Sequence, residues 1–337
     1  MRLDDRFDEL IDTLTGFHRT WIVYLGVELG LFAQLRSAGR EGLAAAELAS
    51  ASGCAPAPIE AWASAADAHG LAELRDGRLA LDEDTAVILL DEARPEFLGG
   101  QFVHSVIASL DWSDMLAFFR TGQPIRHRPD RYRQSIERLT VQDVAVFFQE
   151  ALAELPQLVG ELAAGGRVVD IHCGGGRWLI AMAQRFPSLE LVGIEFEPDS
   201  VARARSSVDG AGLSGRIEIL QGDVTSLGPA GVFDLAYFQY ALHQLSDPVG
   251  ALRTAFAALR PSGRILVLDW ALPSSLEDFR TSQGELIAGV QLDELYQGTA
   301  LATREQFAGW FVEAGLPVEA IDLPSGASLF VAERARG

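Results

Sequence analysis

The chain has 337 residues, of which 48% are hydrophobic and 22% are charged. This length exceeds that of a typical single domain, and the composition supplies apolar material for folded cores, so we expect two folded domains. The 47 acidic and 27 basic side chains give a formal charge of -20, which disfavours nucleic acid and anionic membranes as partners. The two cysteines, Cys54 and Cys173, are too few for the disulfide framework of a small secreted domain.

Targeting signals are not evident in the first 35 residues. The N-terminus lacks the basic start and apolar core of a signal peptide. The most apolar stretch, residues 21–35, is interrupted by Glu28 and two glycines, and it is shorter than the ~20 residues of a membrane span. We therefore expect a cytoplasmic protein that is not anchored in a membrane.

Residues 6–35 carry apolar side chains at steps of three and four, which is the spacing of amphipathic helices. The apolar positions outnumber those that one short helix can bury against its own domain. A partner surface is implied, either the second domain or a second copy of the chain. We predict a homodimer that is joined through these helices.

Residues 42–90 have the pattern of a winged helix. Two helices (residues 44–50 and 58–69) flank a break at residues 53–56, and the Asp76-Gly77 pair then predicts a hairpin. Such modules can enter the major groove of DNA, so a DNA-binding regulator is one alternative. The second helix, however, has no Arg or Lys to reach a base or phosphate. A packing or dimerisation role is favoured.

The pattern of apolar residues changes twice in the remainder of the chain. Residues 95–160 are helical in pattern, and their basic stretch at residues 126–133 is expected to be a solvated loop, with a lid over an acidic substrate as the alternative. Beyond residue 166, strand-like runs alternate with helix-length segments, which is typical of a doubly wound α/β domain. The predicted strands are residues 167–171, 189–194, 217–220, 235–240 and 264–268.

A glycine-rich turn follows the first of these strands, in the run Val-Val-Asp-Ile-His-Cys-Gly-Gly-Gly at residues 168–176. Glycines there allow the backbone to approach a ligand closely, and the helix that follows offers free amides. Glu195 lies about 20 residues further on, at the end of the next strand, where such folds grip the hydroxyls of a ribose. This spacing suits NAD and S-adenosylmethionine (SAM) alike.

Two later segments bring the chain close to a known family. Gly222-Asp223-Val224 follows the third strand, and residues 233–247 lead through a helix to the strand that ends at Asp269. This order resembles the class I SAM-dependent methyltransferases. With the helical start and the winged helix, the chain is similar to the small-molecule O-methyltransferases of plant phenylpropanoid and bacterial polyketide pathways.

The resemblance implies a division of the chain and a function. It implies a helical winged-helix dimerisation domain at residues 1–95, connecting helices at 96–160 and a Rossmann-like, SAM-binding methyltransferase domain at 161–337. The implied reaction is methyl transfer to a hydroxyl oxygen of an aromatic or polyketide-like small molecule. Methylation at nitrogen or carbon, and use of SAM for chemistry other than methylation, stay open as alternatives. No residue spacing suggests a metal site.

The resemblance also implies roles for individual residues in binding SAM. Asp170, Gly174 and Gly176 would border its methionine part, and Glu195 would bind its ribose hydroxyls. Further cofactor contacts would come from His172, Phe196, Asp223, Val224 and Gln239, with Asp223 accepting from the adenine amino group and Phe196 and Val224 packing against the ring. His172 departs from the family, which usually has glycine there.

His243 occupies the position of the general base in the plant-type O-methyltransferases. A histidine near its ordinary pKa can take a phenol proton at neutral pH. Asp269 matches the acid that orients this base. The second acid of the family falls near Leu301, so we expect that support for the base to be missing.

Overall fold

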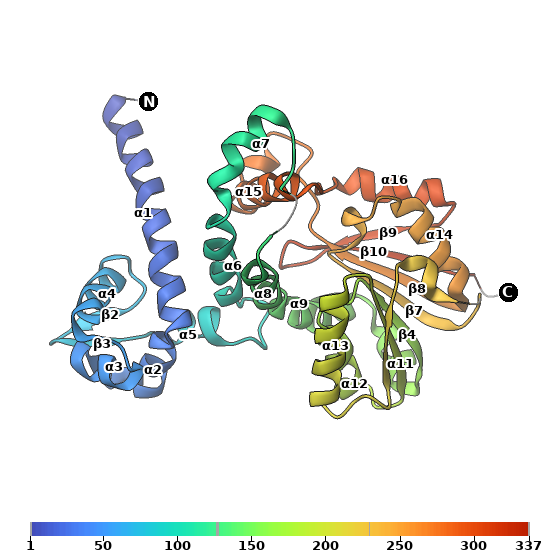
Figure 1. Ribbon diagram of the computed structural model, residues 1–337, viewed down its shortest axis with the longest axis horizontal. Coiled ribbons are helices and arrows are strands. Elements are labelled where there is room, and N and C mark those ends of the chain that lie inside the picture. The colour runs from blue at the N-terminus through green and yellow to red at the C-terminus, as the bar shows by residue number, and fades with distance from the viewer. Residues whose placement is uncertain (1, 126–127, 229, 336–337) are drawn as a thin grey trace. The chain divides into compact units, whose positions relative to one another are not determined.

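The structure is a computed structural model that describes residues 2–125, 128–228 and 230–335. The chain forms two compact units. Unit 1 comprises Met1–Ser113 and Arg128–Ala145, and unit 2 comprises Asp114–His127 and Val146–Gly337. The segment around residues 114–145 therefore belongs partly to each unit (Figure 1).

Unit 1 is mostly helical, with one small antiparallel sheet. Its helices are α1 (Leu3–Glu28), α2 (Leu31–Ala38), α3 (Ala45–Ser52), α4 (Pro56–Ala68), α5 (Glu83–Leu90), α6 (Gly99–Ser109), α8 (Asp130–Leu139) and most of α9 (Val141–Val146). Its sheet has the order β1-β3-β2, formed by Leu43–Ala44, Arg78–Ala80 and Glu73–Arg75. Helices α3 and α4 followed by the β2–β3 hairpin match the predicted winged-helix pattern.

Local sequence explains the hairpin and the core of unit 1. Asp76 and Gly77 both have positive φ angles, 51° and 77°, as a tight hairpin turn between right-twisted strands requires. The core contains the rings of Phe32 and Trp62, whose centroids lie 5.3 Å apart. The indole nitrogen of Trp62 donates to the carbonyl of Ile22 at 3.0 Å, so this large side chain is buried without an unpaired polar atom.

The first half of α1 presents an apolar stripe to solvent. We define the α1 stripe as the exposed residues Leu3, Phe7, Leu10, Leu14 and Phe17. Within α1, the buried residues are Val23 and Gly26, near its C-terminal end. Unit 1 therefore covers only the end of this helix.

The basic stretch at residues 126–133 differs from the sequence prediction of a loop, because residues 130–133 begin α8. Residues 126–127 lie outside the described residues. Arg128 is buried, with its guanidinium 4.0 Å from the ring centroid of Tyr132 and 3.9 Å from the carboxylate of Asp111. The prediction of a solvated loop is therefore wrong for Arg128, because an aromatic face and a buried carboxylate compensate its charge.

Unit 2 is built on a seven-stranded sheet in the order β6-β5-β4-β7-β8-β10-β9. Strands β4 to β8 pair in parallel, and β10 is antiparallel to both β8 and β9. The strands are β4 (Gly166–Ile171), β5 (Leu189–Glu195), β6 (Ile217–Gln221), β7 (Phe233–Gln239), β8 (Leu259–Asp269), β9 (Glu319–Asp322) and β10 (Ser328–Glu333). The five predicted strands are confirmed. The antiparallel β10 departs from the strand order of dinucleotide-binding sheets.

Helices cover both faces of this sheet (Figure 1). The helices of unit 2 are α7 (Met115–Thr121), α10 (Leu152–Glu154), α11 (Pro156–Ala164), α12 (Arg177–Arg185), α13 (Pro198–Gly210), α14 (Pro248–Ala258), α15 (Ser282–Gln297) and α16 (Arg304–Ala314), with a π-helical turn at Phe147–Ala151. Of these, α12, α13, α14 and α16 contact the strands of the sheet. Alternate residues of β4 face opposite cores: Val168 lies in one, and Val169 and Ile171 lie in the other. The doubly wound α/β prediction is confirmed.

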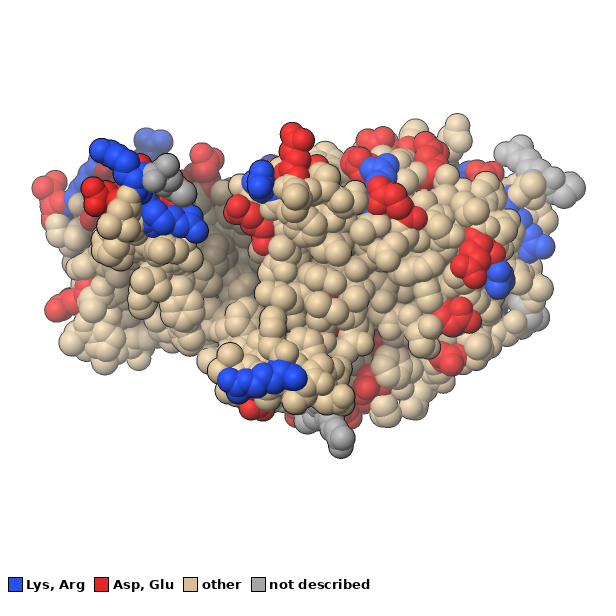
Figure 2. Space-filling model, turned by 90° about the horizontal axis from the view of Figure 1, so that it is seen from above, with Lys and Arg blue, Asp and Glu red and all other residues tan. Residues whose placement is uncertain are grey.

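The surface adds two observations. Among the described residues, no helix combines the length and the apolar character that crossing a membrane requires. On the face drawn in Figure 2, the basic residues form only small clusters, and most of these clusters lie beside acidic residues.

Candidate functional site

The glycine-rich turn between β4 and α12 has an unusual backbone. His172, Gly174 and Gly176 all have positive φ angles, of 64°, 51° and 77°. The amides of His172 and Cys173 donate to the carbonyl of Ile194 at 2.8 and 3.1 Å, which fixes the turn to β5. The left-handed conformation explains why glycine suits position 172, and a histidine there carries a backbone strain of order 1–2 kcal/mol.

Asp170 lies at the carboxyl end of β4 and is 3% exposed. Its Oδ1 atom is buried without a hydrogen-bond partner among the described residues. Burial raises the pKa of this carboxyl well above its usual value, and the charge of Glu195 adds to the effect. A positively charged ligand group beside Oδ1 would compensate both the burial of the carboxyl and the nearby charge of Glu195.

Glu195 lies at the end of β5, and the residue is 5% exposed. Its carboxylate is held in place by two backbone amides. Its Oε2 accepts from the amide of Gly174, and its Oε1 accepts from the amide of Glu197, both at 3.0 Å. Each carboxylate oxygen has a further lone pair, so both can also accept from ligand hydroxyls. The amides therefore preorganise the group that the sequence assigns to a ribose.

His172 and Phe196 form an aromatic pair next to Glu195, with ring centroids 5.1 Å apart. Phe196 is 50% exposed, which leaves ring surface for a planar ligand. Burial lowers the pKa of His172, while the charges of Glu195 and Asp223 oppose that shift. The imidazole is therefore neutral at pH 7.

The remaining candidate cofactor residues follow β6 and β7. Asp223 is exposed, and its Oδ1 accepts from the amide of Thr225 at 2.8 Å and from the Thr225 hydroxyl. Val224 begins the 3₁₀ turn Val224–Leu227 and packs against the core. The Oε1 atom of Gln239, at the end of β7, accepts from the hydroxyl of Tyr237 at 3.3 Å.

Strand register brings the candidate cofactor residues to one edge of the sheet. Asp170 is paired with Gly193 on β5, and Glu195 is paired with Gln221 on β6. The strands are parallel and adjacent, so their carboxyl ends meet at the same edge. We call this group (Asp170 to Gly176, Glu195, Phe196 and Asp223) the cofactor edge. An unpartnered acidic oxygen, an open glycine turn and a fixed carboxylate fit a cationic nucleoside such as SAM.

His243 and Asp269 form a buried pair at the carboxyl ends of β7 and β8. His243 lies in the 3₁₀ turn Leu242–Gln244, and its Nδ1 is 2.7 Å from Oδ2 of Asp269. The side chains are 3% and 0% exposed. The other oxygen, Oδ1, accepts from the amide of Trp270 at 2.9 Å. This arrangement places a proton on Nδ1 and leaves the Nε2 lone pair available.

Two carboxylates near His243 counteract the effect of burial on its pKa. Burial alone would lower the pKa of His243, but the carboxylates of Asp269 and Glu294 raise it above its ordinary value. Asp269 has a raised pKa because of burial, and its bonds to His243 and Trp270 oppose that shift. The Nε2 atom of His243 is buried and lacks a hydrogen-bond partner among the described residues.

Glu294, on α15, is a second acid next to His243. Its Oε2 lies 3.9 Å from Nε2 of His243, and its side chain is 14% exposed. The sequence-based expectation that a second acid is missing is therefore wrong. Leu301, the position assigned to it, is a buried apolar residue. The acid comes instead from α15, seven residues earlier in the chain.

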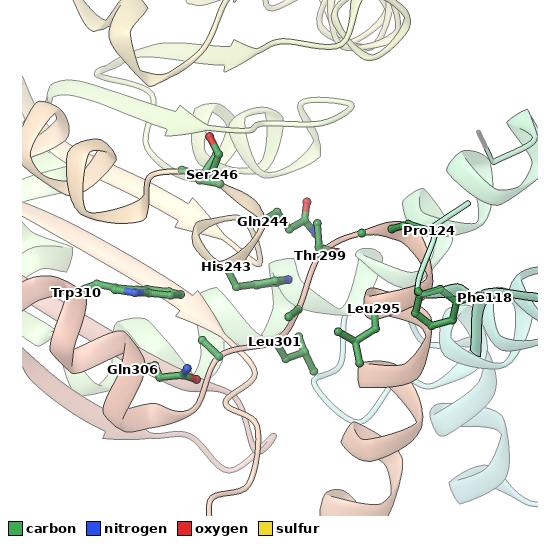
Figure 3. Close-up of a pocket in the computed structure, with 15 residues that line it drawn as sticks. Phe118, Pro124, His243, Gln244, Ser246, Leu295, Thr299, Leu301, Gln306 and Trp310 are labelled. Carbon is green, nitrogen blue, oxygen red and sulfur yellow. The ribbon is translucent and has the colours of Figure 1, made fainter. Parts of the chain in front are cut away.

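A pocket of about 740 Å³ opens beside His243, entirely within unit 2. Figure 3 shows the His243 ring extending toward the loop that carries Thr299 and Leu301. The lining residues are Phe118, Gly122, Pro124, His243, Gln244, Leu245, Ser246, Leu295, Gly298, Thr299, Ala300, Leu301, Ala302, Gln306 and Trp310. The lining combines apolar side chains with five polar ones (His243, Gln244, Ser246, Thr299 and Gln306), and its described residues include no Lys or Arg. We call it the acceptor pocket, and its size suits a multi-ring molecule.

Residues 162–315, which span β4 to α16, match the family described as a methyltransferase domain. This region contains both the cofactor edge and the His243 pair. The chain therefore carries a methyltransferase domain, and its sheet and site resemble those of class I SAM-dependent methyltransferases. Among the described residues of this methyltransferase, no group of three or more His, Cys, Asp or Glu side chains is arranged to hold a metal.

Two relatives cover most of the length of the methyltransferase. It is 27% identical to a mitomycin biosynthesis 6-O-methyltransferase of Streptomyces lavendulae, over 94% of this chain and 90% of the relative. It is 27% identical to a 3-hydroxy-5-methyl-1-naphthoate 3-O-methyltransferase of Streptomyces sahachiroi, over 77% of this chain and 75% of the relative. The structure of human N-acetylserotonin methyltransferase in complex with SAM shares the fold, with a TM-score of 0.74, 18% identity and 99% coverage of both chains.

One functional candidate of the methyltransferase, Glu294, escaped the sequence reasoning. Its segment, Leu-Asp-Glu-Leu-Tyr-Gln-Gly at residues 292–298, has the ordinary appearance of a helix end. A signal was present: Gly298 fixes where the helix ends, and Glu294 is four residues before it, on the last turn. The sequence could not show that this turn faces His243, because that contact joins segments about 50 residues apart.

Proposed function

We propose that this methyltransferase transfers the methyl group of SAM to a hydroxyl oxygen of an aromatic or polyketide-like natural product. The observation that carries the proposal is His243: its Nδ1 is bonded to Asp269, and its buried Nε2 lies at the wall of a large, mostly apolar pocket. Deprotonation is needed for a hydroxyl acceptor, and a positioned histidine supplies it. The two Streptomyces relatives, both named as O-methyltransferases, support the same reaction.

We assign the cofactor edge to SAM. The carboxyl of Asp170 would face the cationic methionine part, with Gly174 and Gly176 lining it. The carboxylate of Glu195 would accept from the ribose hydroxyls. The rings of Phe196 and His172 would pack near the adenine, with Asp223, Val224 and Gln239 as outer contacts. The unpartnered Oδ1 of Asp170 and the amide-fixed carboxylate of Glu195 support this assignment.

When bound, SAM supplies a methyl group on a positively charged sulfur. The residues of the chain prepare the acceptor for it. His243 would take the acceptor's proton at Nε2, which would leave the hydroxyl oxygen free to accept the methyl group. Asp269 holds the imidazole in the required tautomer and, with Glu294, stabilises the imidazolium that forms. The apolar pocket wall excludes water and aligns the acceptor.

The reaction is tested with the purified chain, SAM carrying a labelled methyl group, and a panel of hydroxylated naphthoates, quinones and phenols. We expect one labelled methyl per product molecule, placed on oxygen by NMR of the product. A product methylated at carbon or nitrogen would overturn the assignment of a hydroxyl acceptor, but the chain would still be a methyltransferase. The panel pairs each carboxylate-bearing acceptor with a neutral one of the same ring system, because the described residues of the pocket lining include no Lys or Arg.

We further propose that the methyltransferase works as a homodimer in the cytoplasm, with a second copy covering the α1 stripe. Five exposed apolar residues on one helix exceed what a monomer usually leaves open. Both cysteines are free thiols, which accords with a reducing compartment. Light scattering should give a dimer for the wild type, and Leu14→Asp should weaken it. The neighbouring exposed change Thr13→Asp is the control, and equal behaviour of both variants would exclude this interface.

A further inference from the structure

The C-terminal end of α15 has a specific capping geometry. Gly298 has a φ of 94°, its amide donates to the carbonyl of Leu295 at 3.1 Å, and the amide of Thr299 donates to the carbonyl of Glu294 at 2.9 Å. These two bonds define a Schellman motif, in which the second residue past the helix end lies over the last turn. The motif therefore places Thr299 directly beside Glu294.

The side chains at these two positions make an unusual pair for this motif. A Schellman motif commonly has an apolar contact between these positions. Here the hydroxyl of Thr299 donates to Oε2 of Glu294, and it also lies 3.2 Å from the carbonyl oxygen of that residue. Thr299 lines the acceptor pocket, as Figure 3 shows, so the pair is at the site and not on a remote surface.

The bond from Thr299 holds Glu294 near His243 without allowing direct contact. The Glu294 Oε2 atom is 3.9 Å from Nε2 of His243, which is beyond hydrogen-bond distance. The Nε2 atom accordingly has no hydrogen-bond partner among the residues that the structure describes. At this separation the carboxylate can stabilise a positive charge on the imidazole. It does not fill the position that an acceptor hydroxyl needs.

We propose that Thr299 is a positioning residue of the methyl-transfer site, whose hydroxyl keeps the Glu294 carboxylate beside His243 but off Nε2. The proposal rests on the proposed function of His243 as the base. Two charged groups act on His243, Asp269 from β8 and Glu294 from α15. Asp269 already bonds Nδ1, so Glu294 is the group that can compete for Nε2. Removal of the Thr299 hydroxyl frees it to do so.

The test compares Thr299→Val, which has the same shape without the hydroxyl, with Thr299→Ser, which keeps the hydroxyl. Valine should preserve the fold, because an apolar residue is usual at this position of the motif. The titration of His243 is followed by NMR of histidine-labelled protein, with its signal assigned by loss in His243→Ala. In Thr299→Val we expect the midpoint to move upward by about one pH unit, since the carboxylate then bonds the imidazolium directly.

Kinetics give a second readout. At pH 7, kcat/KM of Thr299→Val should fall about tenfold, and Thr299→Ser should stay near wild type. When Glu294→Gln is already present, adding Thr299→Val should change neither the titration nor the rate further. The proposal is overturned if His243 titrates alike in Thr299→Val and wild type, or if the shift persists in the Glu294→Gln background. The titration needs no substrate, so its result stands even if the acceptor panel gives no O-methyl product.

Discussion

The cofactor edge and the acceptor pocket are encoded in different ways. The cofactor edge is formed by the ends of three neighbouring parallel strands, and its residues follow a regular pattern of strand, turn and acid. The acceptor pocket collects side chains from α7, the turn after β7, the end of α15 and α16. The comparison teaches that local spacing identifies where the cofactor binds, whereas the acceptor site depends on contacts between distant segments.

Two buried aspartates sharpen this comparison. Asp170 at the cofactor edge and Asp269 in the acceptor site are 3% and 0% exposed, and burial raises the pKa of both. Asp269 has a partner on each oxygen, whereas Oδ1 of Asp170 has none among the described residues. Both oxygens of Asp269 are thus satisfied by the protein, whereas ionised Asp170 would leave one oxygen without a partner among the described residues.

The largest effect is expected for His243→Ala. This change should lower kcat by about 10²–10⁴-fold, the contribution of a positioned general base. The affinity for SAM should stay nearly unchanged, because the base faces the acceptor pocket and not the cofactor edge. Single-turnover methyl transfer measures the rate, and calorimetry measures the affinity.

Asp269→Asn supplies the matched variant for this prediction. It keeps the shape of the side chain but no longer selects the tautomer with the proton on Nδ1, so the rate should fall through the same group. A near-normal rate for His243→Ala would contradict the role of His243 as a base. It would favour methylation at nitrogen or carbon, in which alignment of donor and acceptor supplies the acceleration.

A smaller effect is expected at the cofactor edge. Glu195→Ala should weaken SAM binding by about 1–3 kcal/mol, or about 5- to 150-fold, because the ribose hydroxyls would lose a buried partner. Glu190→Ala is the control: it is the same substitution on the same strand, at an exposed position near the opposite end. Calorimetry on both variants decides the assignment, and equal affinities would remove Glu195 from the site.

Sequence patterns predicted the cofactor half of unit 2 well. The strands β4 to β8 and the turn at residues 172–176 follow from apolar runs and glycines that are close together in the chain. The prediction did not include β9 and β10, because β10 pairs with β8, about 60 residues earlier in the chain, and β9 pairs only with β10. The buried position of Arg128 was missed for the same reason, since Asp111 compensates it from the turn after α6.

His172 shows what a sequence pattern can flag without explaining. The departure from glycine was visible, but only the φ angle of 64° shows that the histidine keeps the left-handed turn. Its ring packs against Phe196 at 5.1 Å. This contact offsets part of the strain, in an environment that keeps the imidazole neutral.

The smallest effect concerns the stability of the ligand-free protein. Asp170→Asn removes a buried charge with an unpartnered oxygen while keeping the shape of the side chain. We expect the melting temperature at pH 8 to rise by about 2–4 °C, which corresponds to about 1 kcal/mol for a domain of this size. SAM binding should weaken in the same variant, because the cationic methionine part loses its counter-charge.

The pH dependence gives the sign of this effect. The pKa of Asp170 is higher in the folded than in the unfolded protein, so the wild type loses stability as pH rises from the unfolded value through the folded one. The difference in melting temperature between Asp170→Asn and wild type should therefore narrow as pH is lowered toward the usual range of a carboxyl pKa. Asp269→Asn should behave oppositely and lower the melting temperature, because it breaks a satisfied pair with His243. Thermal unfolding of both variants at several pH values measures this. A lower melting temperature for Asp170→Asn without ligand would mean that the Asp170 carboxyl, like that of Asp269, is already satisfied by the protein.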